Sequence, residues 1–475
     1  MADKGGVSRR GFLQGVGAAG AVSCSGFLPF RAAVASDGFF EIAAGRSEHR
    51  LYKPDAAASS LWTYNGGLPG PEIRARRGET IKVRLINNLE EGTSIHWHGI
   101  RIDNAMDGVS GLTQQAVAPG ETFEYEFTSP DAGTYWYHAH NKSWNQVGRG
   151  LYGPLIIEED TQVFDRDHDL TLLLDDWRLD QDGKLHLESF GSMMDWSHAG
   201  RLGNWLTVNG KSLPSYTLNA GEAYRLRLVN AANARILELD LAGLGARIVA
   251  LDGQALEAPM DAPEGPFPLG PAQRADIIMV PKAGQALALR EVSGNAPFDV
   301  AQFPVSPGST DQQSHAAMPV LPVNSLPEPD LSKARELTLH MTGGAMGMMG
   351  AMTYKGAPLT REIMRETGQL WAFNGVANLP EQSFFAAERG ETIAVTVRND
   401  TAFAHAMHSH GHHFRILEQS LPLAPDMNTW RDTFLIAPGE TTKIAFVADN
   451  PGKWLFHCHM LEHAAAGMTT WFEVA

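Results

Sequence analysis

Three copies of one sequence pattern divide the chain, and they constrain its fold more than any other feature. Each copy has an apolar segment ending in an Asn-Gly pair, then a Gly-Glu step, then a segment in which apolar and polar residues alternate. The Asn-Gly pairs begin at Asn65, Asn209 and Asn374. Alternation with a period of two is typical of a half-buried strand in an antiparallel sheet. The chain is therefore expected to be all-β, with three β-sandwich domains.

The first 35 residues have the features of an export signal that precedes the three units. Arg9-Arg10 is followed by a Gly/Ala-rich run and by the small-residue sequence Ala33-Val34-Ala35. This order resembles a twin-arginine signal; a chance arginine pair before a tail, or lipoprotein cleavage before Cys24, are the alternatives. We expect the folded chain to pass through the export translocon to the periplasm. The domains would then occupy residues 36–160, 161–328 and 329–475.

Charge and composition limit the partners of such a chain. With 38 basic and 54 acidic residues the net charge is −16, which argues against nucleic acid or an anionic membrane as partner. Beyond residue 35 the apolar runs are far shorter than the roughly 18 residues that span a bilayer. The two cysteines, Cys24 and Cys458, exclude a disulfide framework. We expect a monomer without a membrane span that acts on small molecules.

Four His-x-His pairs occur in the outer two units. In a strand, residues i and i+2 face the same side, so each pair can present two imidazoles to one metal cluster. One such pair is weak evidence, but here an Ala-Pro-Gly-Glu-Thr motif precedes one pair in each outer unit by the same distance. The middle unit has a counterpart of that motif, residues 270–276, and no histidine pair after it. Imidazole alone leaves copper, zinc and iron open. The pairs are His96 and His98, His138 and His140, His408 and His410, and His457 and His459.

The last segment adds a second group of candidate ligands. Cys458 is followed by His463 and Met468, and His405 lies shortly before His408. A thiolate, two imidazoles and a thioether are the ligand set of a blue-copper electron-transfer site. Zinc is the alternative, but zinc seldom uses methionine. Because Cys458 is bonded through the backbone to the histidines on either side of it, a short covalent path connects the two groups.

These motifs together resemble the three-domain multicopper oxidases, the family of laccases and cuprous oxidases. The resemblance implies three cupredoxin-like Greek-key β-sandwich domains and four copper ions per chain. It assigns the type 1 copper to His405, Cys458, His463 and Met468, the type 2 copper to His96 and His408, and the type 3 pair to His98, His138, His140, His410, His457 and His459.

The same resemblance implies the reaction. The family oxidises a reductant at type 1, one electron at a time, and reduces O2 to water at the other three coppers. Asp107 matches the family's acidic residue beside the cluster and is the candidate proton donor, with an Asp-Gly turn as the simpler alternative. Many bacterial relatives carry a second acid directly after the last type 1 histidine, and here that position is Ala464.

The reductant is the open question, and a methionine-rich stretch bears on it. Five methionines lie within Met341–Met352, among glycines that make a stable helix unfavourable. Thioethers suit Cu(I), and copper-detoxifying members of the family carry such segments near type 1. The alternative is that flexible methionines fill a gap between domains. The pair Met193-Met194, beside Asp195 and His198, is a weaker candidate for the same region.

The sequence therefore predicts an oxidase of phenols and aromatic amines or of Cu(I), the latter serving copper tolerance, with other metal ions also open. The alternative function is a non-catalytic exported copper-binding or structural protein with the same fold.

Overall fold

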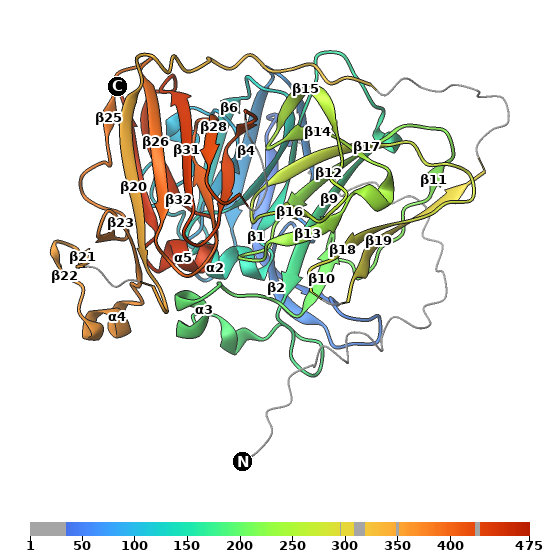
Figure 1. Ribbon diagram of the computed structural model, residues 1–475. Helices are drawn as coiled ribbons and strands as arrows, with labels where there is room; N and C mark the ends of the chain where they lie inside the picture. Colours follow the sequence, from blue (N-terminus) through green and yellow to red (C-terminus); the bar gives the residue numbers. More distant parts are fainter. Residues whose placement is uncertain (1–34, 295, 308–318, 348–350, 423–427) are drawn as a thin grey trace.

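The computed structural model describes residues 35–294, 296–307, 319–347, 351–422 and 428–475. The expected export signal, residues 1–35, lies almost wholly outside the described residues. Six sheets account for the strands, two in each of three units, as the repeats predict (Figure 1). The domain limits derived from the repeats stay predictions.

The first unit consists of two four-stranded sheets. In order, one sheet contains β2 (Ser59–Tyr64), β1 (Phe40–His49), β4 (Thr80–Asn87) and β6 (Thr122–Thr128), and the other contains β3 (Ile73–Arg76), β8 (Tyr152–Glu158), β7 (Gly133–Ala139) and β5 (Ile95–His98).

The middle unit has a six-stranded and a five-stranded sheet. In order, the first contains β10 (Trp205–Val208), β9 (Asp169–Trp177), β12 (Tyr224–Asn230), β17 (Arg274–Met279), β14 (Arg247–Leu251) and β15 (Gln254–Asp261), and the second contains β11 (Leu218–Asn219), β19 (Phe298–Ser306), β18 (Ala286–Glu291), β13 (Leu237–Asp240) and β16 (Phe267–Leu269).

The third unit has a nine-stranded and a five-stranded sheet. In order, the first contains β22 (Ala357–Pro358), β21 (Thr353–Tyr354), β24 (Val376–Ala377), β23 (Trp371–Phe373), β20 (Arg335–Gly343), β26 (Thr392–Asn399), β31 (Thr441–Val447), β28 (Phe414–Gln419) and β29 (Trp430–Arg431), and the second contains β25 (Ala386–Ala387), β33 (Thr469–Val474), β32 (Gly452–Cys458), β27 (His405–Ser409) and β30 (Thr433–Ile436).

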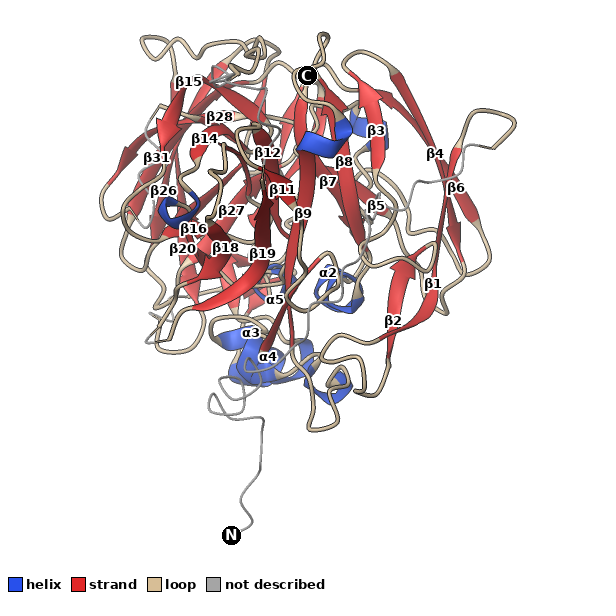
Figure 2. Ribbon diagram, turned by 90° about the vertical axis from the view of Figure 1, so that its right-hand side faces the viewer, coloured by secondary structure: helices blue, strands red, loops and turns tan. Residues whose placement is uncertain are grey.

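The short α-helices gather at one end of the molecule in both views (Figures 1 and 2). They are α2 (Ser143–Gln146), α3 (Met193–Ser197), α4 (Arg361–Thr367) and α5 (Leu461–Ala465). No helix of the described residues is long and apolar enough to cross a bilayer.

The alternating strands of the repeat behave differently in the first and middle units. In β4, Ile81, Val83 and Leu85 are buried and the residues between them are partly exposed, which is the expected half-buried pattern. In β12, however, Arg225 and Arg227 on the polar face are also buried. The expectation of a half-buried strand is therefore wrong for the middle copy, because this face packs against the first unit. The sheets are also mixed, since β4 and β12 each pair with one parallel and one antiparallel neighbour.

The buried arginines on that face of the middle unit are paired with buried carboxylates, because water does not reach them. Arg225 and Arg227 both donate to the carboxylate of Asp169, at 2.7 to 3.0 Å. Arg227 also donates to Thr134 Oγ1 of β7 at 2.7 Å, and this hydroxyl donates to Asp276 at 2.6 Å. Buried charges persist only when they are paired and hydrogen-bonded, so these contacts fix the middle unit against the first.

The apolar cores show how the three units are joined. The main cluster of the middle unit contains only its own residues, among them Leu226, Leu228 and Ile277. The largest cluster instead runs through both outer units, and includes Trp97 and Trp454. The outer units therefore share a continuous core, and the histidine pairs lie where these two units meet.

Gly133 provides a test of the contact between the first and middle units. Its φ is +155°, and a Cβ built there would lie 2.0 Å from the carbonyl oxygen of Gly253. Gly133→Ala should lower the melting temperature by several degrees, because backbone rather than a flexible side chain must move. Gly78 is the control, since it has φ +77° but open space around it. A calorimetric melting temperature that falls equally in Gly133→Ala and Gly78→Ala would contradict this account.

Candidate metal centre

Strand pairing brings the histidine pairs of each outer unit side by side. In the first unit, β5 pairs with β7 so that His96 lies opposite His138. In the third unit, β27 pairs with β32 so that His408 lies opposite His457. Directly opposed residues on one face have their side chains about 5 Å apart. Each unit therefore presents two adjacent His-x-His pairs, and the shared core holds the two sets together.

The eight histidines form three groups in which one ring nitrogen of each member lies within 4.8 Å of the others. The group that matches the expected type 2 ligands also includes a third histidine, His98, which belongs to two groups at once. Every group draws on both outer units. The groups are His96, His98 and His408; His98, His138 and His459; and His140, His410 and His457.

The ring nitrogens show that these groups suit a metal. Among the described residues, Nε2 of His96, Nδ1 of His98, Nε2 of His408 and Nδ1 of His459 are buried without a hydrogen-bond partner. The opposite nitrogens of His96 and His408 donate to backbone carbonyls at 2.8 and 2.9 Å. A buried polar atom without a partner costs about 1–3 kcal/mol, which metal coordination would offset. The donor set therefore fits copper.

Burial also keeps these imidazoles neutral, as metal ligands must be. Desolvation lowers the pKa of His140 to about 3 and, with the neighbouring rings, lowers the pKa of His98, His138, His410 and His459 well below the ordinary histidine value.

The second candidate group lies around Cys458. The Sγ atom lies 3.6 Å from Nδ1 of His405 and 3.8 Å from Nδ1 of His463, and these nitrogens are 3.0 Å apart. Met468 is buried beside them, with its backbone hydrogen-bonded to both Cys458 and His463. Burial raises the pKa of the Cys458 thiol to about 12, so a metal bound here would have to displace its proton. The structure thus brings together all four residues of the expected type 1 set.

The remaining nitrogen of His463 is covered by the middle unit. Its Nε2 donates to the backbone carbonyl of His198 at 2.6 Å, directly after α3, and the ring is fully buried. Trp371 packs against the same ring and donates to the carbonyl of Trp196 at 2.7 Å. Arg178 holds Asp195 of α3 with two hydrogen bonds of 2.7 and 2.9 Å. Residues 192–198, which we call the α3 segment, therefore lie between His463 and solvent.

Asp107 lies where the resemblance expects it. It is fully buried, and its carboxylate accepts from Nδ1 of His410 at 3.0 Å, while its backbone carbonyl accepts from His96. The Asp-Gly turn is present as well, since Gly108 has φ +81° and a Cβ there would collide with the carbonyl of Ile95. Asp107 is therefore both part of an Asp-Gly turn and in contact with the histidines, so the two interpretations do not exclude each other.

The methionine-rich stretch is only partly as expected. Met341 lies in β20 within the large core cluster, and Met352 packs with Leu359 and Met364 in a smaller one. For these two methionines the packing therefore favours the alternative that they fill apolar gaps. Met346 is 81% exposed, and Met348 and Met349 lie outside the described residues.

Two functional candidates were missed by sequence reasoning. Asp432 accepts hydrogen bonds from Arg274 of the middle unit and lies against His98. The sequence offered one signal for this contact. Arg274 lies in the middle unit's counterpart of the motif that precedes a histidine pair in each outer unit. Glu462, directly before His463, is buried and accepts from Asn233 at 2.8 Å. Burial raises the pKa of Glu462, and no motif had indicated it.

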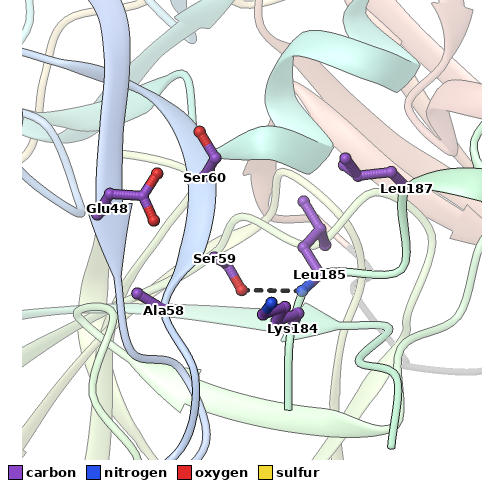
Figure 3. Close-up of a pocket in the computed structure, with 7 residues that line it drawn as sticks. All are labelled: Glu48, Ala58, Ser59, Ser60, Lys184, Leu185 and Leu187. Atoms are coloured by element: carbon purple, nitrogen blue, oxygen red, sulfur yellow. Dashed lines mark hydrogen bonds between the residues drawn. The ribbon is translucent and has the colours of Figure 1, made fainter. Parts of the chain in front are cut away.

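A cavity of about 300 Å³ lies elsewhere, between the first and middle units, and Figure 3 shows the residues around it. Two of its lining residues are joined by a hydrogen bond from the Leu185 amide to Ser59 Oγ at 2.8 Å. Its lining has no histidine and no cysteine, so it is separate from the metal groups. The lining residues are Glu48, Ala58, Ser59, Ser60, Lys184, Leu185 and Leu187.

Comparison with known proteins supports the geometry. Three family models described as multicopper oxidase match residues 47–162, 168–290 and 352–475. Multicopper oxidase MmcO of Mycobacterium tuberculosis is 27% identical over 98% of this chain and 97% of its own. Laccase-1 of Botryotinia fuckeliana is 30% identical, over 88% of this chain and 79% of its own.

A solved structure gives the same result. The multi-copper oxidase from Pseudomonas thermotolerans superposes with a TM-score of 0.78 at 33% identity, covering 92% of this chain and 98% of its own. The predicted fold of three cupredoxin domains is therefore confirmed, and the chain belongs to the multicopper oxidase family of enzymes.

Proposed function

We propose that the protein oxidises Cu(I) at the site around Cys458 and passes the electrons to O2, which is reduced to water at the three histidine groups. Four coppers per chain would be held by the residues that the family resemblance assigns to types 1, 2 and 3. When bound, copper supplies the one-electron chemistry at both sites. The proposal rests on one observation. Buried, unpartnered ring nitrogens of both outer units lie close together, and two of the eight histidines are the direct sequence neighbours of the cysteine in the second site.

The α3 segment supports a small reductant. His463 is fully buried and its outer nitrogen is occupied by the His198 carbonyl, so a bulky phenol has no direct contact with this ring. The segment itself presents Met193 and Met194, which are 41% and 65% exposed. Ala345, next to the exposed Met346, donates to the carbonyl of Ser197 at 2.7 Å. Exposed thioethers near this site, on a chain of net charge −16, suit a soft cation.

Asp107 is the proposed proton donor. Reduction of O2 to water consumes protons among neutral imidazoles, and the Asp107 carboxyl is hydrogen-bonded to His410 Nδ1 within that group. Because the Asp107 carboxylate accepts from Nδ1 of His410, it fixes the tautomer with the proton on Nδ1 and orients the ring so that Nε2 points away from Asp107. Asp107 therefore both orients this ring and can transfer a proton. Export to the periplasm, and a role there in copper tolerance, complete the proposal.

Replacing the thiol tests the site around Cys458. Cys458→Ser should abolish the intense visible absorption of the copper-loaded protein and its oxidase activity, since the thiolate–copper bond is lost. About three of four coppers should remain, measured by elemental analysis, because the histidine groups are intact. Met468→Leu is the comparison, because it keeps the thiol and should keep a visible band. A fully copper-loaded wild-type protein without that band would refute the assignment.

Replacing Asp107 separates its two roles. Asp107→Asn keeps an acceptor for His410 but removes the titratable proton, so copper content should stay at the wild-type value while turnover falls by about 10²-fold or more. Asp103→Asn, four residues earlier and exposed, is the matched control and should have wild-type turnover. Turnover of Asp107→Asn that equals wild type across the pH range would leave Asp107 a turn residue only.

The α3 methionines test the choice of reductant. In Met193→Ser/Met194→Ser the KM for Cu(I) should rise by about tenfold, equivalent to losing roughly 1.4 kcal/mol of binding, while phenol oxidation is unchanged. Met260→Ser, at a methionine of the same unit that is 40% exposed, is the control. Met352→Ser should instead lower the melting temperature and reduce every activity, because Met352 is 5% exposed in a core. Equal loss of Cu(I) and phenol oxidation in the double variant would favour a general laccase.

A further inference from the structure

The middle unit supplies no candidate ligand among the described residues, but its Arg274 contacts a residue beside the histidine groups. Arg274, at the start of β17, is fully buried. Its Nη1 and Nη2 donate to the two carboxylate oxygens of Asp432 at 2.8 and 2.6 Å. Its Nε donates to the backbone carbonyl of Thr134 in the first unit at 3.2 Å. This guanidinium therefore contacts all three units at one point.

The other side of Asp432 faces two of the histidines. Oδ1 lies 3.3 Å from Nε2 of His98 and 3.6 Å from Nδ1 of His408, and the backbone carbonyl accepts from the same Nδ1 of His408 at 2.9 Å. Each imidazole ring therefore has one nitrogen in contact with Asp432, and its other nitrogen is buried without a hydrogen-bond partner. Because His98 belongs to two of the three groups, the orientation of its ring affects both.

The surroundings leave little freedom for either charged group. Asp252 accepts from the Arg274 amide at 2.9 Å and from Nε of Arg431 at 2.7 Å, so the two arginines and two aspartates form a buried, paired set. A Cβ on Gly99, the residue after His98, would lie 2.3 Å from Arg274 Nη2 and 2.6 Å from Asp432 Oδ2. The backbone of the first unit is therefore in direct van der Waals contact with this ion pair.

We infer that Arg274 is a positioning residue of the copper cluster: its two hydrogen bonds fix the Asp432 side chain, and Asp432 fixes the rings of His98 and His408 with their free nitrogens toward the metal. This inference rests on the proposed copper sites. It assigns a role to the middle unit that ligand spacing does not show. Partners of ligating histidines typically change metal affinity or activity 10- to 100-fold when mutated.

The test compares two buried arginines of the same sheet. Arg274→Met should lower the affinity for the type 2 copper by about tenfold or more, measured by chelator competition, and change its EPR hyperfine splitting, while the visible band of the Cys458 site stays. Arg227→Met is the matched control, because Arg227 is equally buried and also bonded to an aspartate and to Thr134. It should lose stability and keep wild-type copper affinity and EPR parameters.

Two further variants keep the inference falsifiable if Arg274→Met folds poorly. Arg274→Lys keeps the charge without the paired geometry, so its copper affinity should lie between that of Arg274→Met and wild type. Adding Arg274→Met to Asp432→Asn should have little further effect on affinity, because both changes break one chain of contacts. Additive losses, a wild-type EPR spectrum in Arg274→Met, or the same copper loss in Arg227→Met would overturn the inference. A wild-type protein that binds no copper would instead refute the proposed function.

Discussion

The burial of eight imidazoles between two β-sandwiches is the constraint on which the rest of this structure depends. Each ring must lose its hydration, and at least four nitrogens are left without a partner among the described residues. Buried polar groups are tolerated where a protein group, an ordered water or a metal ion satisfies them. Two features keep the sandwiches close enough to bury these rings. They are the continuous core of the outer units and the ion pairs that fix the middle unit.

Short-range patterns predicted the three β-sandwich units and the two histidines on one face in each His-x-His pair, whereas the assignment of ligands to copper types came from the family resemblance. Period-two alternation specifies strands, and a His-x-His pair in a strand needs only the pleat to place both rings on one face. The pairing of His96 with His138, and of His408 with His457, then follows from two neighbouring strands within one unit. The repeat motif carried this information twice, once in each outer unit.

What the sequence did not predict depends on contacts between units. The alternation of β12 indicates a polar face, but whether Arg225 and Arg227 meet water or the first unit is decided by packing. Methionine spacing likewise cannot distinguish the buried Met341 and Met352 from the exposed Met346. Arg274 lies more than 150 residues from Asp432 in the sequence, and no local pattern joins them.

The middle unit contacts both candidate copper sites in different chemical ways, and this has a consequence for specificity. It covers His463 with a backbone carbonyl, which any residue at position 198 would offer, so the exposed side chains of the α3 segment can change without altering the ligand beneath them. It holds Asp432 with a guanidinium, a geometry that no other side chain reproduces. The choice of reductant is thus separable from the geometry of the cluster, even though a single domain contributes to both.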